Sequence, residues 1–285
     1  MMYPYRVPRS WSETSGQSPL SCLSFQNVTK TYEGAVRALD EVTLDLEPGL
    51  LTVLLGASGS GKTTLLKTAI GLVEPDSGTV RIGSLAMAGR TKSAARRRLA
   101  MIHQDFGLVT RLSVARNVMA GVCTETSLWR LLLQAYPKDV QLRAAEALFS
   151  VGLTASQFNR KARDLSGGQM QRVGIARALM RYPQILLADE PIASLDPAAS
   201  DNVMQILRRL CDERGIGVVC SLHQISFARR YADRIVAMRH GQVIFDGPPS
   251  AFSGERLEHV FGQEATATST PRLAHPVPAA GKYMT

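Results

Sequence analysis

The sequence predicts an α/β protein with a parallel sheet at its core and a helical segment set into its middle. Continuous apolar runs at 51–55, 185–188 and 218–222 suit strands that are buried on both faces of a parallel sheet. Apolar stripes with helical spacing separate these runs. One stripe, from Val140 to Val151, falls in a segment of about residues 105–170 that we expect to be helical.

Antiparallel pairing is predicted at both ends of this core. Apolar and polar residues alternate at 24–28 and 42–46, which indicates half-exposed strands. Near the other end, residues 235–239 and 242–245 flank His240-Gly241, a pair suited to a two-residue hairpin turn. The core is therefore expected to combine a parallel sheet with antiparallel elements.

Size and composition are those of an ordinary globular domain. The chain has 285 residues, of which 45% are hydrophobic and 20% are charged. No apolar stretch reaches eighteen residues, so we expect no membrane span. The N-terminus has no apolar segment behind a basic start, so we expect no secretory signal. Residues 1–20 and 262–285 lack periodicity and are predicted to be flexible tails around one domain at 21–261.

The formal net charge of +9 raises the question of a nucleic-acid partner. Residues 90–98 hold five basic side chains, but no aromatic residues interleave with them as base stacking would require. A solvated face is the first interpretation and a face toward anionic lipid headgroups the second. We expect no nucleic-acid partner.

Four cysteines occur without metal-ligand spacing, at Cys22, Cys123, Cys211 and Cys220. None of them forms a C-x-x-C pair, and no histidine lies at a suitable distance. Reduced thiols in a cytosolic protein are expected, rather than a disulfide framework or a zinc site.

A phosphate-binding loop is predicted at 56–63, where Gly-x-x-x-x-Gly-Lys-Thr follows a buried strand and opens a helix. Glycines let backbone N–H groups approach a phosphate closely, and the helix N-terminus adds partial positive charge. Lys62 can reach the β- and γ-phosphates, and the hydroxyl of Thr63 can bind Mg²⁺. The candidate nucleotide-binding residues here are Gly56, Ala57, Ser58, Gly59, Ser60, Gly61, Lys62, Thr63 and Thr64.

A second candidate anion site opens another predicted helix. Ser166 can cap this helix, and Gly167 and Gly168 expose backbone N–H groups before Gln169. Taken alone, the segment could be a helix cap and nothing more. Two candidate phosphate-binding helix starts in one chain call for a common explanation.

An acidic pair ends the apolar strand at 185–188. A carboxylate at a strand end can hold Mg²⁺ through water, and a neighbouring carboxylate can polarise an attacking water. We therefore assign Asp189 to Mg²⁺ and Glu190 to general base catalysis. The alternative, a surface acid pair, fits poorly after so apolar a strand.

Together the sequence Leu165-Ser166-Gly167-Gly168-Gln169 and the phosphate loop resemble the ABC ATPases. The resemblance covers about residues 22–260. It implies a P-loop NTPase fold, with a RecA-like parallel sheet core, an antiparallel β subdomain and an inserted α-helical subdomain. It also implies ATP and Mg²⁺ as ligands. In this family the signature of one subunit covers the γ-phosphate held by the other, which implies a homodimer with two composite sites.

Four further residues take family roles by resemblance. Gln104 matches the Q-loop glutamine, which senses Mg²⁺ and the membrane partner. Asp196 matches the D-loop and can also cap a helix that has Pro197 at its first position. His223 matches the switch histidine that contacts the γ-phosphate. Tyr32 matches the aromatic that stacks on adenine, although an ordinary strand-end tyrosine is the alternative.

More specific stretches look like the ATPases of bacterial phosphonate importers. They are Thr126–Arg130, Ile192-Ala193-Ser194 and Ser221-Leu222-His223-Gln224. This likeness implies integral permease subunits, an indirect link to a periplasmic binding protein, and a peripheral location on the cytoplasmic face of the bacterial inner membrane. An importer for phosphite or another oxyanion stays open, as does a soluble ABC ATPase, which usually carries two cassettes or a coiled-coil insert.

A permease-docking surface is expected on the helical insert. Gln104 lies at its entrance, and an apolar cluster within it, Leu128, Trp129, Leu131 and Leu132, could mark a partner site. Internal packing of the insert is the alternative for Trp129.

Overall fold

The structure is a computed structural model that describes residues 22–125 and 136–252. The predicted tails and the apolar cluster at 128–132 lie outside the described residues. No helix of the described part is long and apolar enough to cross a membrane.

A six-stranded sheet forms the centre of the molecule, and its strand order is β10-β9-β3-β8-β7-β6. Five of the strands are parallel, and β10 pairs antiparallel with β9 at one edge. The strands are β3 (Leu51–Leu55), β6 (Leu99–Ile102), β7 (Ile185–Ala188), β8 (Gly217–Leu222), β9 (Arg234–Arg239) and β10 (Gln242–Gly247).

Both faces of this sheet are covered, which explains the continuous apolar runs. In β3, Val53 and Leu55 belong to one hydrophobic cluster, while Leu54 between them belongs to another. Every residue of β3, β7 and β8 is buried. The three strands predicted from apolar runs are confirmed, because successive side chains point to opposite, equally apolar faces.

A smaller antiparallel sheet has the order β2-β1-β4-β5. It consists of β1 (Leu23–Tyr32), β2 (Val36–Leu46), β4 (Ser77–Ile82) and β5 (Leu85–Ala86). The first two strands are longer than predicted. Bulges shift their pairing, with Asn27 and Glu41 at positive φ, so the regular alternation ends before the strands do.

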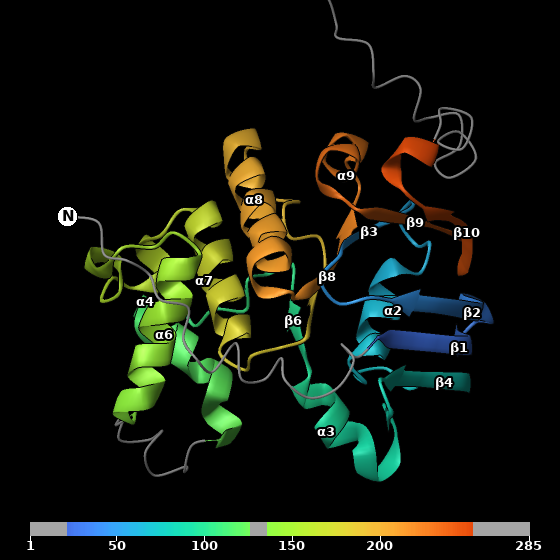
Figure 1. The fold of residues 1–285 in the computed structure, drawn as a ribbon, viewed down its shortest axis with the longest axis horizontal. Helices are drawn as coiled ribbons and strands as arrows, with labels where there is room; N and C mark the ends of the chain where they lie inside the picture. The colour runs from blue at the N-terminus through green and yellow to red at the C-terminus, as the bar shows by residue number, and fades with distance from the viewer. Residues whose placement is uncertain (1–21, 126–135, 253–285) are drawn as a thin grey trace, which may run out of the picture.

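Helices cover the central sheet on both sides (Figure 1). In this view α7 and α8 lie between the central strands and the pair α4 and α6, while α2 lies on the side of the antiparallel sheet. The α-helices are α2 (Lys62–Ala69), α3 (Lys92–Arg97), α4 (Val114–Met119), α6 (Lys138–Ser150), α7 (Gly167–Leu179), α8 (Pro197–Arg214) and α9 (Ile225–Tyr231). Short 3₁₀ helices lie at 89–91, 120–125, 155–157, 162–164 and 249–251.

The helical region between β6 and β7 packs as one group, because α4, α6 and α7 contact one another. Its buried side chains join the larger hydrophobic cluster with one face of the central sheet. The observed architecture agrees with the predicted fold class of a parallel core, an antiparallel sheet and a helical region. The hairpin is also confirmed, since His240 and Gly241 both have the positive φ that its turn requires.

Candidate nucleotide site

The phosphate loop joins the buried strand β3 to helix α2. Gly56 and Gly61 have φ angles of 155° and 107°, and Gly59 has 79°. A Cβ atom at Gly61 would overlap the carbonyl oxygen of Ala38, and one at Gly56 would overlap that of Met238. The glycine spacing is therefore required by the tertiary packing as well as by the local turn.

Lys62 is buried inside this loop. Its Nζ donates to the carbonyl oxygens of Gly56 at 2.8 Å and Ala57 at 3.0 Å. Burial lowers the pKa of the Lys62 ammonium, while the charges of Glu190 and Asp189 act against that shift. The loop thus concentrates positive charge and backbone dipoles at the N-terminus of α2, where Thr63 and Thr64 form the first turn.

Two of the three predicted Mg²⁺ ligands, Thr63 and Asp189, meet beside this loop, and the third, Gln104, is described below. The hydroxyl of Thr63 donates to Oδ1 of Asp189 at 3.0 Å, although the two residues are far apart in the sequence. The Oγ of Ser221 donates to the same Oδ1 at 2.8 Å. A hydroxyl beside a carboxylate is the hard oxygen donor set that Mg²⁺ prefers, so these residues fit the ion.

Glu190 and His223 also come together. The Oε1 of Glu190 and the Nε2 of His223 are 2.7 Å apart. Glu190 follows β7 with a φ of 48°, an uncommon backbone conformation for a residue with a side chain. Its backbone N–H donates to the Oγ of Ser221 at 2.8 Å, so the turn that carries Glu190 is tied to the neighbouring strand β8.

The segment 166–169 opens α7 as predicted. The Oγ of Ser166 accepts a hydrogen bond from the backbone N–H of Gln169, and the side chain of Gln169 accepts one from the backbone N–H of Ser166. This capping box fixes the start of the helix. Within the described part of the chain, no hydrogen bond joins this segment to the phosphate loop.

Asp196 caps α8 by accepting from the backbone N–H of Ala199 at 2.9 Å, and Pro197 follows as predicted. The starts of α7 and α8 lie side by side, since a Cβ at Gly168 would be 2.9 Å from that of Ala199. A Cβ at Gly167 would be 3.3 Å from Cδ2 of Leu195. The predicted signature and D-loop therefore form one surface.

Gln104 and Tyr32 lie at the edges of this arrangement. Gln104 follows β6, the neighbour of β7, and is exposed. Tyr32 ends β1 with 44% of its surface exposed, and Nζ of Lys30 is 5.8 Å from its ring centroid. Neither residue hydrogen-bonds to the acidic pair in the part of the chain that the structure describes.

Sequence reasoning missed two residues that organise the site. Ser221 was noted only as part of a stretch that resembles the phosphonate-importer ATPases, and its one further signal is that it is a polar side chain in an otherwise apolar run. Arg177 of α7 donates to the carbonyl oxygens of Phe106 and Gly107, and burial lowers the pKa of its guanidinium. Nothing local in the sequence indicates this link between α7 and the segment after Gln104.

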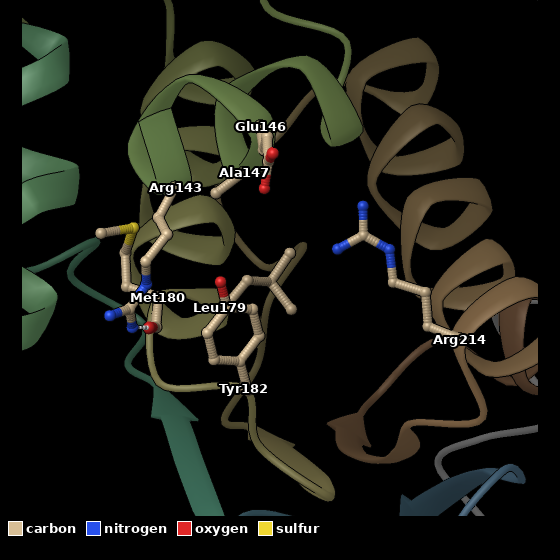
Figure 2. A pocket seen from close by; sticks show the side chains of 7 residues that line it. All are labelled: Arg143, Glu146, Ala147, Leu179, Met180, Tyr182 and Arg214. Carbon is tan, nitrogen blue, oxygen red and sulfur yellow. Dashed lines mark hydrogen bonds between the residues drawn. The ribbon is translucent and has the colours of Figure 1, made fainter. Parts of the chain in front are cut away.

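A separate hollow lies between α6 and the C-terminal ends of α7 and α8 (Figure 2). The guanidinium of Arg143 lies 4.8 Å from the ring centroid of Tyr182, and Arg214 faces the hollow from α8. Ser166 and Asp196 stand at the opposite ends of these helices. Because α7 rises roughly 20 Å over its length, this hollow is not part of the phosphate-binding arrangement.

Comparison with known proteins agrees with this geometry. Residues 39–193 match the model of the ABC transporter family. The chain is 52% identical to the phosphonates import ATP-binding protein of Hyphomonas neptunium, over 84% of this chain and 91% of that protein. It is 43% identical to the protein of the same description from Thiobacillus denitrificans, over 88% and 96%.

Solved structures show the same fold. A dimeric ATP-binding cassette in a post-hydrolysis state, bound to ADP and Pi, is 33% identical with a TM-score of 0.69, covering 80% of this chain and 98% of that one. The cbiO1 protein of Clostridium perfringens, part of an ABC transporter complex, is 27% identical with a TM-score of 0.72, covering 83% and 92%. The chain belongs to the ABC transporter family, as one of its ATP-binding cassettes.

Proposed function

We propose that this ABC-type ATPase is the energy-coupling subunit of a phosphonate importer. The observation that carries the proposal is the continuous set of contacts from Thr63 through Asp189 and Ser221 to Glu190, which ends at His223. It joins a phosphate loop, a cation-binding pair and a candidate base in one place. The phosphonate assignment is supported by the 52% identity to a relative of that description.

Each residue of this set has a distinct role in the proposed reaction. Backbone N–H groups of residues 56–64 and the ammonium of Lys62 bind the triphosphate, and Tyr32 stacks on the adenine. Thr63, Asp189 and Gln104 would hold Mg²⁺, and the bound ion would supply positive charge to the β- and γ-phosphates. The carboxylate of Glu190 orients the attacking water and accepts its proton.

His223 contacts the γ-phosphate and, through its 2.7 Å contact with Glu190, helps to fix the orientation of that carboxylate. The pair therefore combines recognition of the γ-phosphate with activation of the water. Glu190 and His223 follow the neighbouring strands β7 and β8, so a small movement of the bound nucleotide can displace both side chains.

The signature residues act on a second copy of the chain. Ser166, Gly167, Gly168 and Gln169 open a helix whose N-terminus favours anions, yet they form no hydrogen bond with their own phosphate loop in the described residues. In the proposed homodimer they cover the γ-phosphate bound by the partner, and Asp196 lies at the same surface. ATP then closes the dimer and hydrolysis opens it.

The proposed assembly includes integral permease subunits at the cytoplasmic face of the bacterial inner membrane. The ATPase is peripheral there, and its helical region after Gln104 contacts the permease. The periplasmic binding protein selects the substrate. No nucleic acid takes part. The proposed helical subdomain spans about residues 105–170. Helix α7 begins near its end and continues to Leu179.

The role of Glu190 is tested by Glu190→Gln, which keeps the shape and removes the base. We expect hydrolysis to fall by about 10²–10⁴-fold while ATP still binds, because a positioned base contributes about that factor. The variant should also trap an ATP-bound dimer in size-exclusion chromatography. Glu213→Gln, at an exposed position on α8, is the matched control. Near-native turnover of Glu190→Gln with its permease would refute the assignment.

Site sharing is tested by mixing Lys62→Ala and Ser166→Arg subunits. In a homodimer of either variant, both sites carry a defective half. A mixed dimer keeps one site with both halves intact. We expect ATP-dependent dimerisation and partial activity only after mixing. Normal hydrolysis by either variant alone would show that the sites are not shared.

The substrate is tested by deleting the gene and growing cells on a phosphonate, or on phosphite, as the sole phosphorus source. Loss of growth on phosphonate alone supports the proposal. Loss on phosphite alone points to an importer for that oxyanion. Unchanged growth on both, without a redundant importer, overturns the substrate assignment and leaves the ATPase assignment intact.

A further inference from the structure

Ser221 is a fully buried polar residue next to the acidic pair. It lies near the end of β8, where the pairing of Ala188 with Cys220 brings it level with Asp189, the residue that follows the adjacent strand β7. The neighbouring residues of β8 are apolar and also buried. A hydroxyl at this depth is costly unless it is hydrogen-bonded, so its contacts are informative.

The direction of its two hydrogen bonds follows from the chemistry of the partners. The backbone N–H of Glu190 can only donate, so the Oγ of Ser221 accepts from it at 2.8 Å. The single hydroxyl hydrogen is then directed at Oδ1 of Asp189, also at 2.8 Å. One side chain therefore holds the carboxylate of Asp189 and the backbone of Glu190 at the same time.

The two contacts act on separate parts of the proposed reaction. Thr63 and Ser221 both donate to Oδ1 of Asp189, which leaves Oδ2 as the oxygen that neither hydroxyl occupies. The backbone of Glu190 is at a φ of 48°, a conformation that costs roughly 1–2 kcal/mol and must be held by its surroundings. The Ser221 hydrogen bond contributes that restraint.

We propose that Ser221 is a positioning residue, which orients Asp189 toward the cation and fixes the turn that presents Glu190. A single hydroxyl thereby links cation binding to the placement of the base. This inference rests on the proposed roles of Asp189 and Glu190. Its test distinguishes a failure of the Ser221 role from a failure of those proposed roles.

The test compares Ser221→Ala with the conservative Ser221→Thr, which keeps the hydroxyl. Thr52→Val is the matched control, because Thr52 is a buried hydroxyl on the adjacent strand β3 whose Oγ1 has no hydrogen-bond partner in the structure. Asp189→Asn tests the proposed metal role itself. Ser221→Cys, with nearly the same volume and a weak donor, replaces the alanine variant if that variant does not fold.

Four quantities are measured on the full chain. Mn²⁺ binding in the presence of a non-hydrolysable ATP analogue is followed by electron paramagnetic resonance. Binding of a fluorescent ATP analogue in EDTA reports nucleotide affinity without metal. Steady-state ATPase assays give kcat, and thermal unfolding without metal reports the integrity of the fold.

We expect Ser221→Ala to weaken Mn²⁺ binding by about 10-fold and to lower kcat by about 10–100-fold, the range seen when the partner of a metal ligand is removed. Metal-free nucleotide binding should stay within about 2-fold, as should every measurement on Thr52→Val. Ser221→Thr should recover most of the Mn²⁺ affinity. This selective loss and rescue would not follow from a structural role alone.

Native Mn²⁺ affinity in Ser221→Ala, or an equal loss in Ser221→Thr, would overturn the inference. If Asp189→Asn weakens Mn²⁺ binding while Ser221→Ala does not, only the role of Ser221 fails. If Asp189→Asn also leaves Mn²⁺ binding unchanged, the proposed metal ligand is wrong as well.

Discussion

Gly168 offers a sharp test of how the starts of α7 and α8 pack. It is the second residue of α7, and its backbone is helical rather than left-handed. By helix propensity alone, Gly168→Ala should stabilise the protein by up to about 1 kcal/mol. In the structure, however, the new Cβ would be 2.9 Å from the Cβ of Ala199.

That separation decides the sign of the effect. Carbon atoms prefer to lie roughly 3.5–4.0 Å apart, so α7 and α8 must separate slightly to admit the methyl group. Overpacking of this kind costs about 1–3 kcal/mol, which exceeds the propensity gain. We expect Gly168→Ala to lower the free energy of unfolding by about 1 kcal/mol, a fall in Tm of about 2–4 °C.

A double-mutant cycle checks the cause by chemical denaturation. Ala199→Gly removes the opposing methyl group and keeps the N–H that donates to Asp196. In that background Gly168→Ala should stabilise rather than destabilise the protein. Gly174→Ala is the control in the same helix, because its Cβ would meet its nearest neighbour at an ordinary 3.6 Å. The same destabilisation by Gly168→Ala with and without Ala199→Gly would refute the steric argument.

The remaining predictions concern the phosphate loop, the buried thiols and one ion pair. ATP at 100 times its Kd should stabilise the native protein by about 2.7 kcal/mol, which raises Tm by roughly 5–10 °C. Lys62→Ala should lose most of that rise in Tm in differential scanning fluorimetry, and a full rise would contradict the role of Lys62. Burial raises the pKa of the Cys211 thiol to about 12 and also raises the pKa of the Cys220 thiol. Iodoacetamide at pH 7 should therefore label both thiols only after unfolding, as measured by mass spectrometry. Rapid labelling of the native protein would disprove the prediction. A hydrogen bond from Lys30 lowers the pKa of Asp76, so its stabilisation is present above about pH 4 and is lost as the pH falls through the lowered value. Asp76→Asn should therefore lower the free energy of unfolding at pH 7 but not at pH 2, and an equal loss at both pH values would count against the ion pair.

Local motifs were readable because their chemistry depends on neighbouring residues. The Ser166 helix cap and the Asp196-Pro197 helix start are each decided within a few residues. The positive φ angles of the glycines at 56–61 belong to a local turn as well, although distant carbonyl groups also exclude a side chain at Gly56 and Gly61. Strands β3, β7 and β8 were predictable for a related reason, since burial on both faces demands a continuous apolar run. Strands β1 and β2 were underestimated because bulges interrupt the alternation that would have extended them.

The sequence by itself determined which chemistry is present: a phosphate loop, a second anion-binding helix start, an acidic pair and a histidine. Only the tertiary structure decided how these groups meet. Thr63 reaches Asp189 across 126 residues, and Ser221 reaches both acids, because the strand order places β8 between β3 and β7. Strand order and register arise from burial of the whole sheet, so no local pattern encodes the hydrogen bonds that cross from one strand end to the next.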